Sequence, residues 1–392
     1  LLGHPRVARW LAARGDGLSL LVFKPSAQVE QAADAHGWRI LGAPAAIARP
    51  VENKVQFSKI LEARDLPRPA WRELHAATDT WADVTRDLGP RMVVQAAHGF
   101  SGNRSFIVTD EDAFTRVAAL LRARRARATR LVDGSPVTMN ACVLDERRIR
   151  TGPLFHQVTG APECTPYPLG ACGNDWTSAP LPTEVVARAA ATARAVGEVL
   201  AERGFRGVFG LDFVVTTSGE VFTIECNPRL VSSVPMATAL ELEGGHVPLL
   251  ASHLAATGGR HADDAPDIRQ GIRGAQLVLH NLTGSTARVT GALEAGRYRL
   301  EDGVLRFIAP ALKPTECADD GEFVVLAPAH GHVLKAAGEC ARVQMRRGLL
   351  HFPQGVGGGM GVLTEPARAV AMAVYSALAL EPADDMEEAD EE

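Results

Sequence analysis

Short apolar segments flank a helical pattern at the start of the chain. Residues 18–23 form an apolar run that predicts a buried strand, residues 29–36 have the spacing of a helix, and residues 39–41 predict a second short strand. This succession is an α/β pattern, about half the size of a free-standing domain. We therefore interpret residues 1–52 as part of an N-terminal α/β domain. We expect its true N-terminus to lie upstream of the first residue, which is Leu rather than Met.

A longer mixture of helix and strand patterns covers residues 53–265. Apolar positions at helical spacing predict a helix over residues 53–63. Strands are predicted over residues 92–94 and 106–108, on either side of a glycine-containing loop, and an Ala-rich segment predicts a long helix over residues 183–203. This part of the chain is therefore expected to fold as an α+β unit.

The pattern changes again near residue 266. Short strands separated by Gly and Pro are predicted, for example over residues 275–279 and 323–326. We therefore expect a mainly β domain over residues 266–380. Residues 381–392 are mostly acidic, which is typical of a disordered tail.

The most informative segment is a predicted hairpin around residues 216–219. Two β-rich runs flank these four residues, which form a turn candidate. With that turn, Val215 pairs with Glu220, and Asp212 pairs with Thr223. Directly opposed residues share a face of a hairpin, and faces alternate with period two along each strand.

The hairpin therefore separates a polar face from an apolar one. Asp212, Glu225 and Asn227 are predicted to project from one face. The other face is predicted to enter the core, and its residues are Leu211, Phe213, Val215, Phe222 and Ile224.

Two carboxylates and a carboxamide on one face need an explanation, because unpaired carboxylates repel each other and lose hydration. A hard divalent cation removes that penalty, and Mg²⁺ takes one or two protein carboxylates while phosphate oxygens and water complete its shell. We predict that Asp212, Glu225 and Asn227 bind Mg²⁺, with Mn²⁺ as a substitute. Arg229 carries a fork of donors suited to a carboxylate or an acyl phosphate. The alternative is a solvent-facing hairpin with ordinary surface charges, which the shared face and the spacing disfavour.

With these residues in place, the sequence resembles the ATP-grasp family, in particular biotin carboxylase and the carboxylate–amine ligases. An aspartate followed on the next strand by Glu-x-Asn-Pro-Arg, here Asp212 and residues 225–229, is among the most specific signatures of that family. The likeness extends over about residues 40–260. It implies an α+β, ATP-grasp fold in which two α+β subdomains clamp ATP, with a partial α/β domain before it and a mainly β domain after it.

The resemblance also implies nucleotide-binding residues. Lys54 stands where the family places a lysine on nucleotide phosphate, and residues 92–108 match the strand, glycine loop and strand that fold over the triphosphate. In that loop, Gly99 and Gly102 allow close approach of the backbone, and Ser101 can cradle phosphate together with the loop N–H groups. The hinge that binds adenine is assigned to Leu131, Val132 and Asp133.

One position departs from the family pattern. Gln95 stands where the family often has a lysine, at the end of the strand before the glycine loop. A glutamine donates hydrogen bonds to phosphate or adenine but supplies no charge. A nucleotide-binding protein without turnover is therefore kept as an alternative, although the complete set of predicted metal ligands speaks against it.

Residues between the hinge and the long helix are candidates for contact with a second substrate. His156 is either a base or a buried, hydrogen-bonded histidine. Asn174, Asp175 and Trp176 form either a polar pocket with an aromatic wall or a structural loop. The sequence does not choose between these interpretations.

Composition narrows the range of functions. The net charge of −5 gives no general attraction to nucleic acid, and the arginine-rich stretch over residues 122–130 is interpreted as a solvated helix face. No stretch of the sequence is long and apolar enough to span a bilayer, and no secretory signal is visible. Six scattered cysteines without C-x-x-C spacing indicate a reducing, cytoplasmic setting.

The predicted function is an ATP- and Mg²⁺-dependent, ADP-forming carboxylate–amine ligase that makes an amide or peptide bond through an acyl phosphate. Arg229 and Asn227 are the predicted catalytic residues. The expected partners are a small-molecule carboxylate and amine, with no nucleic acid and no membrane, and the oligomeric state is left open, with a homodimer among the options. The product is expected to be a peptide or an amino-acid-derived secondary metabolite. A biotin-carboxylase-like enzyme that uses bicarbonate is the enzymatic alternative.

Overall fold

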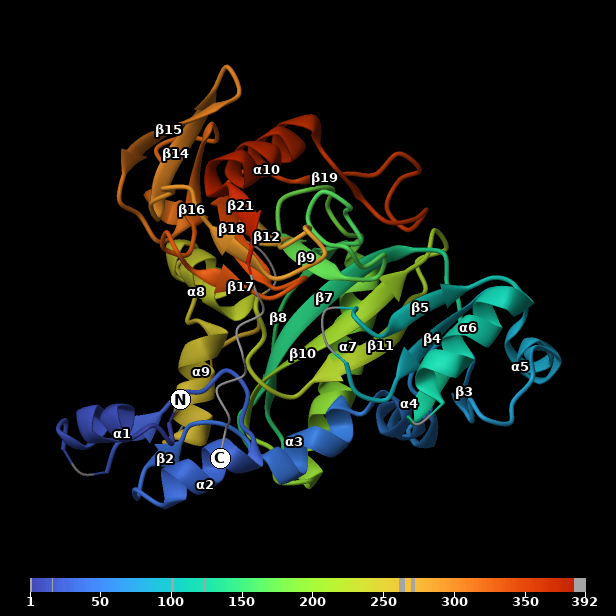
Figure 1. Ribbon diagram of the computed structural model, residues 1–392. Helices are drawn as coiled ribbons and strands as arrows, with labels where there is room; N and C mark the ends of the chain where they lie inside the picture. Colours follow the sequence, from blue (N-terminus) through green and yellow to red (C-terminus); the bar gives the residue numbers. More distant parts are fainter. Residues whose placement is uncertain are drawn as a thin grey trace.

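The computed structural model in Figure 1 describes residues 2–15, 17–99, 102–122, 124–260, 265–268 and 272–383. Residues 384–392 of the predicted acidic tail lie outside this part of the chain, whereas Glu381 and Pro382, at its predicted start, pair with a neighbouring strand instead of being disordered. None of the helices in the described part has the length and apolar character needed to cross a membrane. All six cysteines are free and buried.

The N-terminal unit is a small α/β arrangement at the lower left of Figure 1. Its two short strands pair in parallel, as the strand–helix–strand order requires. Its elements are α1 (Pro5–Ala12), β1 (Ser19–Leu20), α2 (Ala27–Asp34), β2 (Arg39–Ile40) and α3 (Ala45–Glu52). The predicted order is confirmed, although both strands are shorter than predicted.

Helix α4 (Lys54–Ala63) connects the N-terminal unit to the next sheet. The Asn53 side chain caps it by accepting hydrogen bonds from two backbone N–H groups of the first turn, at 3.0 and 3.1 Å. Phe57 and Leu61 on this helix enter the core under the large sheet. The predicted helix is confirmed, and its cap fixes the position of Lys54, the first helical residue.

A four-stranded antiparallel sheet, called the small sheet below, follows helix α4. Its order is β3-β6-β4-β5, with β3 (Trp71–Leu74), β4 (Met92–Ala96), β5 (Ser105–Val108) and β6 (Ala126–Arg130). Helices α5 (Trp81–Leu88) and α6 (Glu111–Leu121) bury Val84 and Phe114 in the core that includes Met92 and Val94 of this sheet.

A ten-stranded sheet, the large sheet, has the order β11-β10-β7-β8-β9-β12-β18-β16-β14-β15. Helix α7 (Thr183–Glu202) packs Ala189 and Ala193 in one core with Met139 and Phe213 of this sheet. Helices α8 (Val234–Glu243) and α9 (Leu249–Thr257) follow the hairpin. The strands are β7 (Ser135–Val143), β8 (Ile149–Thr159), β9 (Ala171–Asp175), β10 (Gly207–Val215), β11 (Val221–Asn227), β12 (Ala275–His280), β14 (Gly296–Glu301), β15 (Val304–Ala309), β16 (Glu322–Leu326) and β18 (Glu339–Met345).

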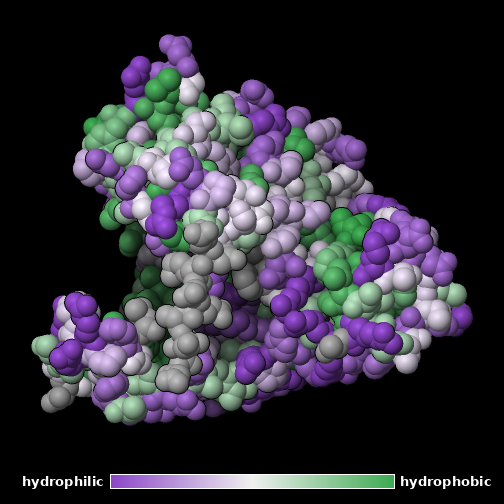
Figure 2. Space-filling view, viewed as in Figure 1, coloured by the Kyte–Doolittle hydropathy of each residue, from purple (hydrophilic) through white to green (hydrophobic). Residues whose placement is uncertain are grey.

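The C-terminal region is mainly β, and its main strands continue the large sheet. Strand β12 pairs with β9, and β18, β16, β14 and β15 extend the sheet from there. Apolar surface gathers over the β14–β15 hairpin at the upper left of Figure 2, where Val304, Phe307 and Ile308 are exposed. The remaining elements are β13 (Ala287–Val289), η1 (Pro314–Glu316), β17 (Val333–Leu334), β19 (Leu350–His351), β20 (Val362–Leu363), α10 (Glu365–Leu378) and β21 (Leu380–Pro382).

The register of the β10–β11 hairpin differs from the predicted one. Val215 pairs with Val221 rather than with Glu220, because Glu220 belongs to the turn. A bulge then shifts the pairing once more, so that Asp212 pairs with Glu225 rather than with Thr223. The two shifts together move the pairing by an even number of residues, so Asp212 and Glu225 keep their predicted common face.

The bulge also changes the composition of the core face. Phe222 and Ile224 were predicted there, but Val221, Thr223 and Cys226 are the deeply buried residues of β11. Ile224 instead lines the cavity described below. That part of the prediction is wrong, because strict alternation does not survive an inserted residue.

The arginine-rich stretch is not a solvated helix face. Helix α6 ends at Leu121, and the following arginines lie in a connection and on β6, an inner strand of the small sheet. Arg125 is exposed and pairs with Glu73, whereas Arg127 is only 2% exposed. Arg127 is buried because it lies within an inner strand and pairs with a neighbouring strand on each side, whereas Arg125 precedes the strand. A helical interpretation of the same residues misses this difference.

Candidate active site

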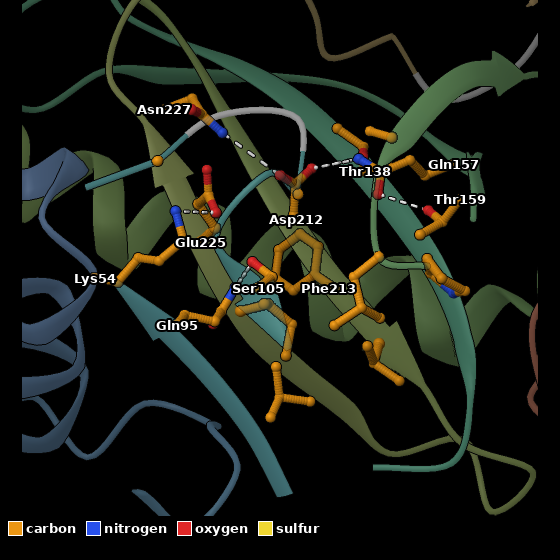
Figure 3. A pocket seen from close by; sticks show the side chains of 18 of the residues that line it. Lys54, Gln95, Ser105, Thr138, Gln157, Thr159, Asp212, Phe213, Glu225 and Asn227 are labelled. Atoms are coloured by element: carbon orange, nitrogen blue, oxygen red, sulfur yellow. Dashed lines mark hydrogen bonds and ion pairs between the residues drawn. The ribbon is translucent and has the colours of Figure 1, made fainter. Parts of the chain in front are cut away.

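A cavity of about 470 Å³ lies where the small sheet faces the β10–β11 hairpin. Strands β4, β5 and β6 line one side of it, and β7, β10 and β11 line the other. Phe23 and Lys24 reach it from the N-terminal unit. Figure 3 shows its polar centre, with Lys54 and Gln95 on one side of Asp212 and Glu225, and Thr138 on the other.

The two predicted metal carboxylates lie directly opposite each other on the hairpin. Glu225 Oε2 forms an ion pair with Lys54 Nζ at 2.7 Å. Asp212 Oδ1 accepts hydrogen bonds from Thr138 Oγ1 at 2.7 Å and from Gln157 Nε2 at 3.2 Å. The fold therefore gives Glu225 a cationic partner and Asp212 only neutral donors.

Their pKa values are shifted in opposite directions. Burial and the negative charge of Glu225 raise the pKa of Asp212 to about 7, against the hydrogen bond from Thr138 and the charges of Lys54 and Arg229. Burial also acts to raise the pKa of Glu225, but Lys54 outweighs it, with help from Arg127 and Arg229, and the net shift is downward. The pair is therefore short of positive charge on the Asp212 side.

This donor set fits a hard divalent cation. Two adjacent carboxylates, one of them destabilised in its charged form, gain most from a cation between them. The described residues contain no group of three or more His, Cys, Asp and Glu side chains that could hold a metal. Two carboxylates nevertheless suffice for Mg²⁺ when phosphate and water complete the shell.

Asn227 and Arg229 lie beside the carboxylates and bind each other. Arg229 Nη2 donates to Asn227 Oδ1 at 2.9 Å, while Asn227 Nδ2 faces Asp212 Oδ2 at 3.4 Å. The amide oxygen that a cation needs is thus engaged by Arg229. Ligation by Asn227 through oxygen requires its amide to turn over.

Glu52 ties Arg229 to the N-terminal unit. It accepts from Arg229 Nε at 2.6 Å and forms an ion pair with Lys24 Nζ at 2.7 Å. Phe23 lies under the Arg229 guanidinium, 5.2 Å from it. The N-terminal unit therefore orients the arginine that was predicted to hold a carboxylate.

The predicted adenine hinge is divided between the cavity and the surface. Leu131 and Val132 line the cavity. Asp133 does not, because its exposed carboxylate is bonded to Arg91 at 2.7 and 2.8 Å. Val93 and Phe213 add apolar surface to the lining, which suits a flat aromatic base.

The glycine loop packs against the β8–β9 connection. Gly99 and Gly102 both line the cavity, and Ser101 lies outside the described residues. Gly102 has φ +76°, and a Cβ there would lie 2.6 Å from the backbone nitrogen of Gly170. A glycine is therefore required at position 102 for both conformation and space.

Gln95 has a partner that the sequence did not indicate. Its Oε1 accepts a hydrogen bond from Arg127 Nη2 at 2.5 Å, and its Nε2 donates to Ser105 Oγ at 2.9 Å. Burial lowers the pKa of Arg127 to about 10, with Glu225 acting against the shift. At that value the guanidinium keeps its charge at neutral pH.

The candidate residues for the second substrate separate into two groups. Asn174 lines the cavity. His156 is buried, bonds to the Ala179 carbonyl at 2.8 Å and contacts the ring of Phe352, and burial lowers its pKa. Asp175 is fully buried and accepts hydrogen bonds from backbone N–H groups, including that of Leu349 at 2.6 Å. These contacts favour structural roles for His156 and Asp175.

Comparison with known proteins identifies the class. Residues 51–233 match the family model described as an ATP-grasp domain. The chain carries an ATP-grasp domain, and the family and fold class predicted from the sequence are confirmed. The predicted enzyme class, an ATP-grasp ligase, agrees with this family.

Two solved structures share the fold. An N5-carboxyaminoimidazole synthase from Aspergillus clavatus, in complex with ADP and 5-aminoimidazole ribonucleotide, has a TM-score of 0.57 and 14% identity, over 88% of this chain and 80% of that one. The biotin carboxylase domain of 2-oxoglutarate carboxylase from Hydrogenobacter thermophilus, in complex with MgADP, ADP and bicarbonate, has a TM-score of 0.61 and 12% identity, over 87% of this chain and 73% of that one. Likeness at these identities concerns the fold.

One curated protein is also similar in sequence. The multifunctional protein pyr1-3 from Dictyostelium discoideum is 24% identical over 208 residues. The matched region covers 51% of this chain but only 9% of that protein. The activity of so much longer a protein does not transfer to this chain.

Several residues that line the cavity or support its lining were not predicted from the sequence. Thr138 and Gln157 hold Asp212 from strands β7 and β8, Glu52 holds Arg229, and Arg127 holds Gln95. Thr138 and Gln157 lie between the predicted hinge and the long helix, in a stretch that was considered only for contact with a second substrate. The signal that could have found Thr138 is its place on the strand that pairs with β10.

Proposed function

We propose that the protein is an ATP-dependent carboxylate–amine ligase that forms an amide or peptide bond and releases ADP and phosphate. The observation that supports this most directly is the opposed pair of Asp212 and Glu225, with Lys54 bonded to Glu225, inside the cavity between the two sheets. Phosphoryl transfer needs a metal held by carboxylates and a fixed cation beside the phosphates.

ATP and Mg²⁺ are the proposed nucleotide and metal. Asp212 and Glu225 would hold Mg²⁺, with Asn227 as a further oxygen donor, and the ion would neutralise charge on the transferred phosphoryl group. Lys54 and the loop N–H groups near Gly99 would hold phosphate oxygens. Leu131 and Val132 would bind adenine through their backbone groups. MgADP in the structure of the Hydrogenobacter thermophilus domain supports this assignment.

The proposed reaction has two steps. A carboxylate oxygen of the first substrate attacks the γ-phosphorus of ATP, the bond from phosphorus to the bridging oxygen breaks, and ADP leaves. The amine nitrogen then attacks the acyl carbon, the bond from that carbon to the phosphate oxygen breaks, and the proton lost by nitrogen goes to solvent. Arg229, oriented by Glu52, would hold the carboxylate. The protein supplies positioning and charge neutralisation.

A phosphate-release screen over pairs of carboxylates and amines tests this function, with bicarbonate among the carboxylates. We expect ADP and phosphate in equal amounts only with a matching pair, and loss of both in Asp212→Ala and Glu225→Ala. Glu220→Ala, in the exposed turn of the same hairpin, is the matched control. Turnover with bicarbonate and no other carboxylate would replace the ligase by a carboxylase. Release that survives both substitutions would overturn the site assignment.

The same proposal includes the cellular compartment, the substrates and the product of the reaction. We place it in the cytoplasm, with a small carboxylate and a small amine as partners, and with a peptide or an amino-acid-derived secondary metabolite as product. A homodimer stays a prediction, which sedimentation equilibrium over a range of protein concentrations tests.

A further inference from the structure

A buried arginine of the small sheet, Arg127, places a positive charge behind the part of the cavity where the phosphates are proposed to bind. Arg127 on β6 is 2% exposed, and its guanidinium donates to Gln95 Oε1 at 2.5 Å, to Ser58 Oγ at 3.0 Å and to the Ile224 carbonyl at 3.1 Å. It also donates to the Lys54 carbonyl at 3.5 Å, and all four acceptors are neutral. The Arg127 Nε–H has no hydrogen-bond partner in the described part of the chain.

This cation has no carboxylate of its own. Among the described residues, no aspartate or glutamate lies within ion-pair distance of Arg127, although unpaired buried charges are costly to remove from water. The negative charge that acts on Arg127 is that of Glu225, which already bonds to Lys54. Lys54 and Arg127 therefore act on the same carboxylate, but only Lys54 is in ion-pair contact with it, so Arg127 keeps a positive charge without an ion-pair partner.

Gln95 connects that charge to the cavity. Gln95 and Ser105 line the cavity, while Arg127 lies behind them. Because Arg127 binds the amide oxygen of Gln95, the amide nitrogen is turned toward Ser105, to which it donates at 2.9 Å. A charged donor on the oxygen polarises the amide and makes its N–H groups better donors.

We propose that Arg127, acting through Gln95, is a positioning residue of the phosphate site: it supplies positive charge to the polyphosphate of the nucleotide and fixes Gln95 as a donor to a phosphate oxygen. This inference rests on the proposed function in taking a nucleotide as the ligand. It explains how the site works with a neutral residue at position 95. The recognised group is the polyphosphate, so Arg127 favours ADP and ATP over adenosine.

A purely structural role is the competing explanation. Arg127 connects β6 to α4 through Ser58 and to β11 through the Ile224 carbonyl, so its removal also loosens packing. Loosened packing would weaken adenosine and ATP alike. Loss of a phosphate-directed charge would weaken the binding of ATP and ADP but not that of adenosine.

Calorimetric titration with MgATP, MgADP and adenosine separates the two roles without requiring turnover. In Arg127→Met we expect the dissociation constant for MgATP to rise by about 30-fold, the size of a lost charge-assisted contact. Adenosine affinity should change by less than about 3-fold. Arg127→Lys, which keeps the charge, should stay near the wild type. Arg125→Met removes an exposed arginine of the same segment and should change neither ligand.

The decisive experiment restores a positive charge at position 95. In Arg127→Met combined with Gln95→Lys, a lysine at the cavity wall replaces the relayed charge, and MgATP affinity should recover to within about 3-fold of the wild type. Equal loss for adenosine and MgATP in Arg127→Met, or no recovery in the double variant, would overturn the proposal. If Arg127→Met does not fold, Arg127→Gln and the double variant carry the same comparison. A chain that binds MgATP through Arg127 but shows no ligase turnover would refute the proposed function and leave this inference standing.

Discussion

The two walls of the cavity carry charges of opposite sign, and these charges lie at different distances from the cavity surface. On the hairpin, Asp212 and Glu225 stand at the cavity surface, where a cation can touch them. On the small sheet, Arg127 lies behind the surface, and neutral Gln95 stands in front of it. A surface charge acts by direct ligation, whereas a buried charge acts by its field and by orienting its neighbour. The hairpin should therefore determine metal binding, and the small sheet should determine how tightly the polyphosphate binds.

The largest expected effect comes from the hairpin wall. Asp212→Asn and Glu225→Gln should each lower the rate of phosphate release by at least about 1,000-fold, because removal of metal-borne charge stabilisation raises the barrier of phosphoryl transfer. The rate is measured by coupled phosphate detection at saturating ATP. Glu220→Gln, in the turn of the same hairpin, should keep the wild-type rate.

The two carboxylates should also differ in their effect on folding. Glu225→Gln leaves Lys54 and Arg127 without their shared carboxylate and should lower the free energy of unfolding by about 3 kcal/mol. Asp212→Asn removes a like charge and should raise it by about 1 kcal/mol in metal-free buffer. Urea denaturation of the metal-free proteins measures both values. Equal destabilisation by the two substitutions would contradict the electrostatic difference between them.

Lys54 links the two walls, so its loss should have an intermediate effect. In Lys54→Met the KM for ATP should rise by about 30-fold, because a fixed cation leaves the phosphate site. Lys59→Met, on the same helix but exposed and paired with Glu73, is the matched control. An unchanged KM for ATP in Lys54→Met would show that this lysine serves Glu225 alone.

The smallest expected effect concerns the junction between the large sheet and the N-terminal unit. His253 Nδ1 accepts the Val208 N–H at 3.0 Å, and its Nε2 donates to the Leu41 carbonyl at 3.1 Å, so the ring is neutral. Burial lowers its pKa, against the hydrogen bond to Leu41. The folded pKa lies below the unfolded value of 6.5, so this contribution to stability is complete above about pH 6.5 and is lost as pH falls through the folded pKa.

Urea denaturation between about pH 7.5 and pH 5 measures that loss. His253→Gln should be less stable than the wild type at the higher pH and should show a flatter pH dependence. His156 is also buried with a lowered pKa, so part of the acid sensitivity should remain in this variant. An equally steep pH profile in His253→Gln would exclude His253 as a source of the acid sensitivity.

The hairpin wall could be predicted from the sequence because its ligands lie on neighbouring strands joined by a short turn. Alternation with period two places Asp212 and Glu225 on one face in both the predicted and the observed register. The bulge before Glu225 could not be predicted, because no Gly or Pro marks it. The bulge changed only which residues of β11 face the core.

The small-sheet wall could not be predicted in the same way. Arg127 and Gln95 lie 32 residues apart, and their contact depends on the pairing of β6 with β4. Glu52 and Arg229 lie 177 residues apart and meet only because the N-terminal unit packs against the hairpin. Side chains that act from behind a surface leave no local spacing pattern. An arginine among other arginines therefore resembles ordinary surface charge until the strands are paired.

Metal binding tests the central claim most directly, because it requires neither the substrates nor turnover. Titration of Mn²⁺ in the presence of ADP, followed by electron paramagnetic resonance, should show one site in the wild type and in Glu220→Gln. That site should be lost in Asp212→Asn and in Glu225→Gln, while Arg127→Met should keep it at saturating ADP. Wild-type Mn²⁺ binding in both carboxylate variants would contradict the assignment of the hairpin as the metal site.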